Sequence, residues 1–303
     1  MNYTMLTGEC KTIKYGFRNK YLIYENIHPC LSAVHTKLSS DGLILREEEM
    51  YLLGSGYALN LMGETIETFN STFVNDLSAC LGIYLEEYHF TDRDIFYGEI
   101  KRNSSINIAP PMVHFRFDQG TFLAIILSVN SNRTYTIINP LTKDIDTVPE
   151  ACVDYSKAWY MMNSPRFLKP VFRSKKEMFE LGIYKLLQRN VQFHLLSGKG
   201  YLICGREQLI LKMYEERSRV EEAALRDLFE RSIEYLEEQL AADFKDLRAL
   251  IHKTKLLWNK LKGNMIEEEA ISLITEIIDS ETIIIKQLTD RLMTDLNLRE
   301  VIA

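Results

Sequence analysis

The hydrophobic pattern of this 303-residue chain changes its period along the sequence, and this change limits the folds that the chain can adopt. Up to about residue 165 the period shifts repeatedly between the helical value and the value near two that is typical of strands. From Ser174 onward the apolar residues recur at helical spacing. The pattern predicts an α+β domain over residues 1–165 and a mostly helical domain over residues 166–303, with the boundary near Pro165 and Pro170. Two domains also fit a norm of roughly 100–200 residues per domain.

The strongest strand signal in the first half is a hairpin. Its first strand is the nearly continuous apolar run Thr121–Val129, which is typical of a buried strand. Residues 130–133 supply turn-forming side chains, and residues 134–138 form a second β-rich run that ends before Pro140. Apolar and polar residues alternate over residues 112–117, which predicts a further strand.

Three helices are expected in the first half. Pro29 suits the first turn of a helix, where its missing N–H costs nothing, and the apolar residues after it recur at helical spacing as far as residue 38. A second helix is expected over residues 46–53, where a glycine-rich turn ends it, and a third over residues 64–81. A short strand over residues 21–24 is expected to precede the first helix.

The second half opens with a capping box. Ser174 is followed three residues later by Glu177, a pair in which each side chain bonds the backbone N–H of the other residue. The box predicts a helix that ends near residues 197–200. A long helix is expected from near Arg206 to Gly263, and a last one over residues 267–296. The apolar face of the long helix indicates packing against other helices of the same chain. Homodimerisation through the C-terminal helices stays open.

Charge, hydropathy and cysteine content limit the class of partner. The formal net charge of -6 argues against nucleic acid, because phosphate binding needs a basic surface. No apolar run approaches the ~20 residues that span a bilayer, and the N-terminus lacks a signal-peptide pattern. The five cysteines are scattered without a CxxC pair, so neither a disulfide framework nor a metal site is expected. We therefore expect a cytoplasmic protein with reduced thiols, no metal and no membrane association.

Cys30 is the first candidate for chemistry. A cysteine in the first turn of a helix lies near unpaired N–H groups and near the positive end of the helix dipole, and both favour the nucleophilic thiolate. The same N–H groups can hold an oxyanion during acyl transfer. The alternative is that Cys30 is a small buried residue without a chemical role, as free cysteines commonly are.

Three short segments around Cys30 resemble one protein family. They are residues 28–34 (HPCLSAV), 40–45 (SDGLIL) and 48–56 (EEMYLLGSG). Together they resemble the N-terminal domain of butirosin biosynthesis protein H, in which a cysteine opens a helix and a glycine, an acidic residue and a glycine-rich turn follow. The resemblance covers roughly residues 20–165. It implies a papain-like fold related to bacteriocin-processing peptidases.

The same resemblance implies an activity. In this family an acyl group passes from the phosphopantetheine thioester of a carrier protein, through the cysteine, to an amine. For this chain it implies an acyltransferase-like protein of peptide or secondary-metabolite biosynthesis, including nonribosomal peptides, with Cys30 as the nucleophile. The implied partner is an acyl or peptidyl carrier protein. No cofactor of its own is expected, because the phosphopantetheine belongs to the partner.

Later segments follow the family pattern with two departures. Residues 111–118 (PMVHFRFD) resemble one of its strands, and the hairpin resembles the segment that begins with the catalytic histidine and ends in Asp-Pro. Thr121 or Phe122 stands where the histidine is expected, and Asn139 replaces the aspartate. Asparagine can orient an imidazole, as in papain-like enzymes. His114, on the neighbouring expected strand, is the best substitute for the base that a cysteine nucleophile needs.

Two other functions stay open. The absence of histidine at Thr121 and Phe122 favours a catalytically inactive papain-like scaffold that serves as a binding or assembly module. The other alternative is a cysteine peptidase that acts on a leader peptide. An acyl adduct on Cys30 distinguishes acyl transfer from the first alternative, and cleavage of a leader peptide without such an adduct indicates the second.

Overall fold

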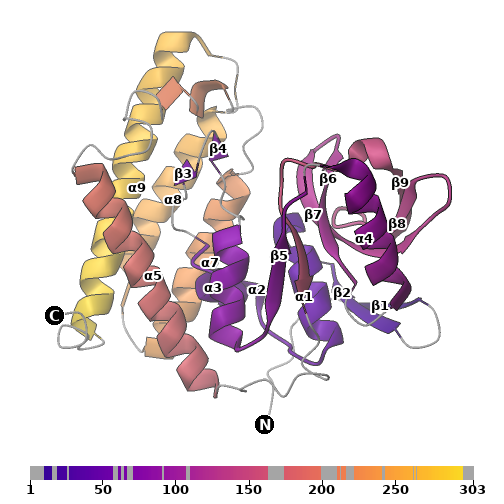
Figure 1. Ribbon diagram of the computed structural model, residues 1–303. Helices are drawn as coiled ribbons and strands as arrows, with labels where there is room; N and C mark the ends of the chain where they lie inside the picture. Colours follow the sequence, from indigo (N-terminus) through magenta and orange to yellow (C-terminus); the bar gives the residue numbers. More distant parts are fainter. Residues whose placement is uncertain are drawn as a thin grey trace. The chain divides into compact units, whose positions relative to one another are not determined.

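The computed structural model describes residues 10–15, 19–25, 27–56, 61–62, 65–66, 71–90, 92–106, 110–162, 174–198, 210–211, 213–215, 222–240, 243–261, 263 and 265–295. The chain divides into two compact units (Figure 1). The first comprises Met1–Met50 and Leu81–Arg173, and the second comprises Tyr51–Cys80 and Ser174–Ala303. Residues 51–80, expected in the first domain, thus group with the second unit. The expected boundary at Pro165 and Pro170 lies outside the described residues.

A six-stranded antiparallel sheet is the centre of the first unit, and it confirms the expected α+β class. The strands lie in the order β5, β10, β6, β7, β8, β9. Three of the four strands expected from the sequence are β6, β7 and β8, and they lie side by side in the middle of the sheet. The fourth, expected over residues 21–24, falls within β2 (Asn19–Tyr24) of a separate hairpin. The bounds are β5 Leu85–Tyr88, β6 Met112–Phe117, β7 Gly120–Val129, β8 Thr134–Ile138, β9 Ile145–Pro149 and β10 Trp159–Met162.

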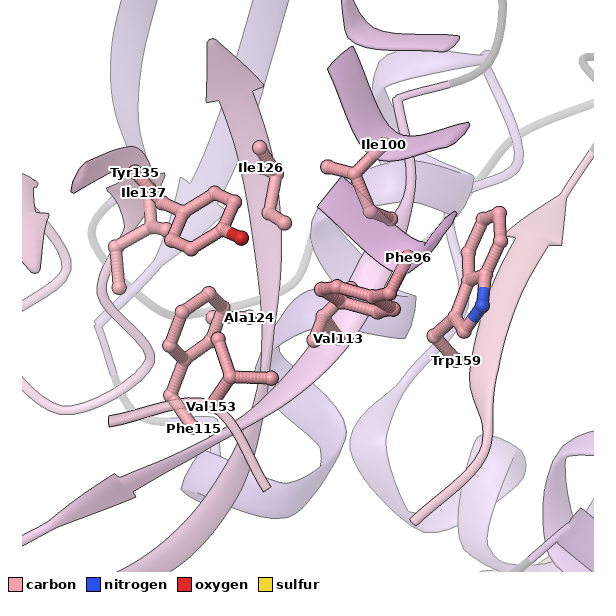
Figure 2. Close-up of a cluster of buried hydrophobic side chains, with 10 residues drawn as sticks. All are labelled: Phe96, Ile100, Val113, Phe115, Ala124, Ile126, Tyr135, Ile137, Val153 and Trp159. Atoms are coloured by element: carbon pink, nitrogen blue, oxygen red, sulfur yellow. The ribbon is translucent and has the colours of Figure 1, made fainter. Parts of the chain in front are cut away.

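Helix α4 (Arg93–Ile106) covers one face of this sheet. Phe96 and Ile100 of the helix pack against apolar side chains of β6, β7, β8 and β10, and the cluster is closed to solvent (Figure 2). Directly paired residues on neighbouring strands share a face. Val113 of β6 pairs with Ala124 of β7, and both belong to this cluster. The remaining members are Phe115, Ile126, Tyr135, Ile137, Val153 and Trp159.

Helix α1 (Pro29–Ser40) covers the opposite face, and its bounds agree with the sequence prediction. Successive residues of a strand point to opposite faces, so Leu123 and Ile125 of β7 point away from α4. Both are buried, and α1 contacts β7. Helix α1 also contacts β2 (Asn19–Tyr24), which pairs with β1 (Cys10–Tyr15) in a separate hairpin. The buried stripe of α1 includes Leu31, Val34 and Leu38.

Helices make up most of the described part of the second unit. The capping box begins α5 as predicted, because the Glu177 N–H donates to Ser174 Oγ and the Ser174 N–H donates to the Glu177 carboxylate. Within the described residues, no helix combines the length and the apolar composition that crossing a membrane requires. The helices are α3 Ser71–Leu81, α5 Lys175–Gly198, α7 Glu222–Leu240, α8 Lys245–Leu261 and α9 Glu267–Asp295, and α2 Glu47–Leu53 runs from the first unit into the second.

The helix expected over residues 64–81 is wrong in its first part. Residues 65–66 form strand β4, which pairs with β3 (Leu61–Met62), and α3 begins at Ser71. Thr65 and Ile66 are β-branched, and β-branched residues fit an extended pairing better than a helix. The apolar spacing therefore predicts the helix correctly over α3, from residue 71 onward.

The expected long helix that ends at Gly263 is also wrong, because α7 and α8 are two helices. Between them the Lys245 N–H donates to the Asp243 side chain over 2.9 Å, a local bond that competes with helix continuation. The two helices are antiparallel, since ion pairs join the start of each to the end of the other. These pairs are Lys255–Asp227 and Arg248–Glu234. The expected start near Arg206 lies outside the described residues.

Candidate functional site

Cys30 is the second residue of α1, directly after Pro29. Its backbone is part of the described helix, and its side chain lies outside the described part of the structure. The position agrees with the sequence analysis, which expected Cys30 in the first turn of a helix. At this position the backbone of Cys30 lies at the positive end of the helix dipole.

The first-turn N–H groups of α1 are partly used within the helix. The N–H groups of Leu31 and Ser32 both donate to the His28 carbonyl, over 2.9 and 3.1 Å. Pro29 has no N–H to donate. The sequence predicts oxyanion binding by the N–H groups of this turn as a whole. The structure removes Leu31 and Ser32 from the set of donors that a substrate oxyanion can use.

Two buried charged side chains hold the backbone just before α1. The Lys143 ammonium donates to the Ile27 carbonyl over 3.1 Å, and the Glu47 carboxylate accepts the His28 N–H over 2.5 Å. Lys143 is 9% exposed and Glu47 is 5% exposed. Buried charges need such partners, because desolvation without them is costly. Sequence reasoning missed both residues, since neither lies near Cys30 along the chain.

Asn139 lies at the end of β8 and forms a turn with its own side chain. Its Oδ1 accepts the Leu141 N–H over 2.8 Å, and its Nδ2 donates to the Asp146 carboxylate over 2.6 Å. The Asn139 carbonyl also accepts the Lys143 N–H over 3.0 Å. The turn that Asn139 builds is therefore the turn that carries Lys143.

His114 lies on β6, on the face of the sheet that α1 covers, because it alternates with Val113 and Phe115 of the opposite face. Its Nδ1 donates to the Ala158 carbonyl over 3.0 Å, which leaves the lone pair on Nε2. Burial lowers the pKa of His114, and the bond to Ala158 opposes this effect only in part. The imidazole is neutral at pH 7, the form that a general base requires.

The two positions expected to hold the catalytic histidine point to opposite faces. Phe122 pairs with Phe115, so its buried side chain lies on the α4 face. Thr121 pairs with Arg116 and lies on the same face as His114. Arg116 and His114 are two residues apart on β6, which makes His114 a diagonal neighbour of Thr121 at roughly 7–8 Å between backbones. The imidazole of His114 thus lies on the strand next to the expected position, on the same face as Thr121.

His114 and Asn139 do not contact each other. The sheet order places β7 between their strands, a separation of roughly 10 Å between backbones. The described hydrogen bonds of His114 and of Asn139 go to other partners. The arrangement in which Asn139 orients the His114 ring is therefore not formed in this structure.

His35 is a fully buried histidine of the first unit. It lies on α1, and its Nε2 donates to the Leu45 carbonyl over 3.1 Å. Burial, followed by the nearby charge of Lys143, lowers its pKa to about 4 against the opposing effect of the Leu45 bond. His35 is a neutral packing residue next to Tyr24, with ring centroids 4.6 Å apart.

The described residues contain no group of three or more His, Cys, Asp and Glu side chains that is suited to hold a metal ion. Three cysteines, Cys10, Cys80 and Cys152, have described side chains. Cys10 is exposed, Cys152 is half-buried, and Cys80 is buried with its thiol donating to the Leu53 carbonyl. Because its thiol is exposed, Cys10 is a suitable control for the reactivity of Cys30.

Comparisons of the chain with protein-family models, with curated proteins and with solved structures gave no match.

Proposed function

We propose that the protein is a cysteine-dependent acyltransferase with a papain-like first unit. The observation that carries the proposal is the place of Cys30 in the first turn of α1, a helix that covers the sheet face on which His114 lies. A helix start favours thiolate, and a neutral imidazole on the same sheet face supplies a base. The segments around Cys30 support the same assignment through their resemblance to the butirosin protein H family.

The proposed reaction has two balanced steps. In the first, the Cys30 thiolate attacks the carbonyl of a carrier-bound thioester, the bond to the carrier sulfur breaks, and the carrier leaves as a thiolate that takes a proton from water. In the second, an amine attacks the acyl group on Cys30, the amide forms, and the Cys30 sulfur leaves. His114 Nε2 takes the proton that the amine loses. The partner carrier protein brings the phosphopantetheine arm, so the chain needs no cofactor of its own.

The direct test is acylation of Cys30 by S-acyl pantetheine thioesters of several chain lengths. Intact-mass measurement and peptide mapping are expected to show one acyl group on the Cys30 peptide, and none after Cys30→Ala. Cys10→Ala is the matched control, because Cys10 is exposed and shows the rate of non-specific acylation. An adduct that forms no faster on Cys30 than on Cys10, with thioesters and with loaded carrier protein, contradicts the proposal.

A second candidate is a binding or assembly module without catalysis. Two observations favour it. The Asn139 side chain makes its hydrogen bonds within its own turn, and Phe122 is buried on the face away from α1. This candidate predicts that Cys30→Ala leaves the cellular function of the protein unchanged. Loss of that function in Cys30→Ala, with the thermal stability retained, excludes it.

A further inference from the structure

We propose that Lys143 supplies the positive charge that keeps Cys30 as a thiolate, and that the Asn139 turn serves to position this charge. The inference rests on the proposed nucleophilic role of Cys30. In papain-like enzymes an imidazolium supplies the charge partner of the thiolate. A lysine ammonium near a cysteine lowers the thiol pKa by the same electrostatic effect. Lys143 acts through Cys30 and is therefore a positioning residue.

The first support is the place of the Lys143 ammonium. It donates to the carbonyl of Ile27, which is the third residue before Cys30, and it also donates to the Pro140 carbonyl. The side chain is buried, so its charge acts through a medium that screens it less than water does. A cation at this point adds to the field of the helix dipole, because both favour negative charge at the start of α1.

The second support is the backbone of the turn. Lys143 has a φ of 60°, in the left-handed region where residues other than glycine are uncommon. The Asn139 carbonyl accepts the Lys143 N–H, and the Asn139 N–H donates to the Asp144 carbonyl, so the turn is fixed on both sides. Glycine fits such a position without strain. The presence of lysine is explained if its long side chain is needed at the start of α1.

Other charged groups around the turn also affect the electrostatic potential at the start of α1. The Glu47 carboxylate on the His28 N–H is an anion, and it opposes the effect of Lys143 on the thiol. His35 is neutral at pH 7 and adds no charge. Asp144 forms an ion pair with Lys11 at the exposed end of the turn, and the Asp146 carboxylate accepts a hydrogen bond from the Asn139 side chain. Removal of the Lys143 charge and removal of the Glu47 charge should therefore move the Cys30 pKa in opposite directions.

The experiment is a site-resolved titration of the Cys30 thiol in the full chain. Rates of iodoacetamide alkylation of the Cys30 peptide are measured from pH 4 to pH 10 by mass spectrometry, with the Cys10 peptide as an internal reference. The variants are Lys143→Gln, which keeps an N–H donor for the Ile27 carbonyl, Lys143→Arg, which keeps the charge, and Glu47→Gln. Circular dichroism establishes which variants are folded.

The native protein is expected to show a Cys30 pKa below about 8.5, the ordinary value of a free cysteine. Lys143→Gln should raise this pKa by about 1 or more, Lys143→Arg should retain it, and Glu47→Gln should lower it. A native pKa at or above the ordinary value overturns the inference even if no variant folds, and so does a pKa that Lys143→Gln leaves unchanged. If the Cys30 pKa is low and depends on Lys143 but no acyl adduct forms, this inference holds and only the proposed acyl transfer is rejected.

Discussion

Burial sets the protonation of the two histidines on or near α1. His35 and His114 are both held in one tautomer by a backbone carbonyl, and burial lowers the pKa of each. His89 differs, because its exposed ring bonds the Glu87 carboxylate. Among these three histidines, only His114 combines a neutral ring with a place on the sheet face covered by α1 and on the strand next to the expected histidine position. For this reason the proposed base is His114.

The buried ring of His35 predicts a pH dependence of stability. Its pKa is about 4 in the folded chain and 6.5 when unfolded, so the unfolded chain binds more protons between these values. The stabilisation is complete above about pH 6.5 and is lost as the pH falls toward 4, by at most about 3 kcal/mol. His35→Gln should reduce this loss.

Chemical unfolding at pH 7 and pH 5 measures this effect. Trp159 and Trp258 are the two tryptophans of the chain, one in each unit, so Trp258→Phe makes the fluorescence report the first unit alone. Equal pH slopes for the His35→Gln variant and its parent contradict the prediction.

At the same scale, the candidate site is only partly predictable from the sequence. The position of Cys30 in a helix start follows from Pro29, a local signal. Lys143 and Glu47 contact the backbone just before α1, although both lie far from it along the chain. Charged residues normally indicate an exposed surface. Their burial depends on partners that only the fold brings together, namely the Ile27 carbonyl and the His28 N–H.

At the scale of the elements, the close packing of Gly54 at the end of α2 leads to a specific prediction. A Cβ added at Gly54 would overlap the ring of Phe73, which is buried. Gly54→Ala should therefore destabilise the second unit by about 1–3 kcal/mol, as overpacking does. Gly98→Ala is the matched control, because the added Cβ meets no atom within 4 Å and lies on α4. It should stabilise the first unit by up to about 1 kcal/mol.

Thermal unfolding of both variants tests this contrast. Trp258 fluorescence reports the Gly54→Ala change, and Trp159 fluorescence reports the Gly98→Ala change. A neutral or stabilising effect of Gly54→Ala means that Phe73 can move away, against the packing described for this turn.

Elements with a long, regular apolar pattern were predictable, and short or polar ones were not. The hairpin β7–β8, helix α1 and the capped start of α5 agree with the sequence because each has its own local signal. Strand β5 has the sequence LEEY, with two adjacent glutamates, and its place is fixed by pairing with β10. Strand β9 is an edge strand with an exposed pattern, which gives a weak hydrophobic signal. Such strands depend on their neighbours rather than on their own sequence.

On the scale of the whole molecule, the two units do not follow the order of the chain. Residues 51–80 belong to the second unit, where the Tyr51 and Phe229 rings lie 6.5 Å apart and the buried Asp76 carboxylate is 3.7 Å from the Lys185 ammonium. The spacing of apolar residues does not show that this segment belongs to the second unit, because the residues that pack against it lie more than 100 positions away along the chain. Sequence periodicity alone therefore cannot reveal the division.

This division predicts how fragments behave. Residues 1–165 expressed alone should not give a cooperatively folding protein, because Tyr51, Leu53 and Asp76 lose the helices of the second unit that bury them. Co-expression with residues 166–303 should restore a soluble complex. Thermal unfolding and binding of a hydrophobic dye distinguish the two cases. A fragment 1–165 that unfolds cooperatively on its own and excludes the dye contradicts the prediction.

The central claim is that acyl transfer passes through Cys30, and a single-turnover chase measures it directly. The protein is mixed with an S-acyl pantetheine thioester, quenched at intervals, and then given an amine acceptor. The account predicts an acyl group on the Cys30 peptide that forms before any amide and decays as the amide appears. Amide that forms at the same rate in Cys30→Ala, or a Cys30 adduct that the amine never discharges, would contradict the account.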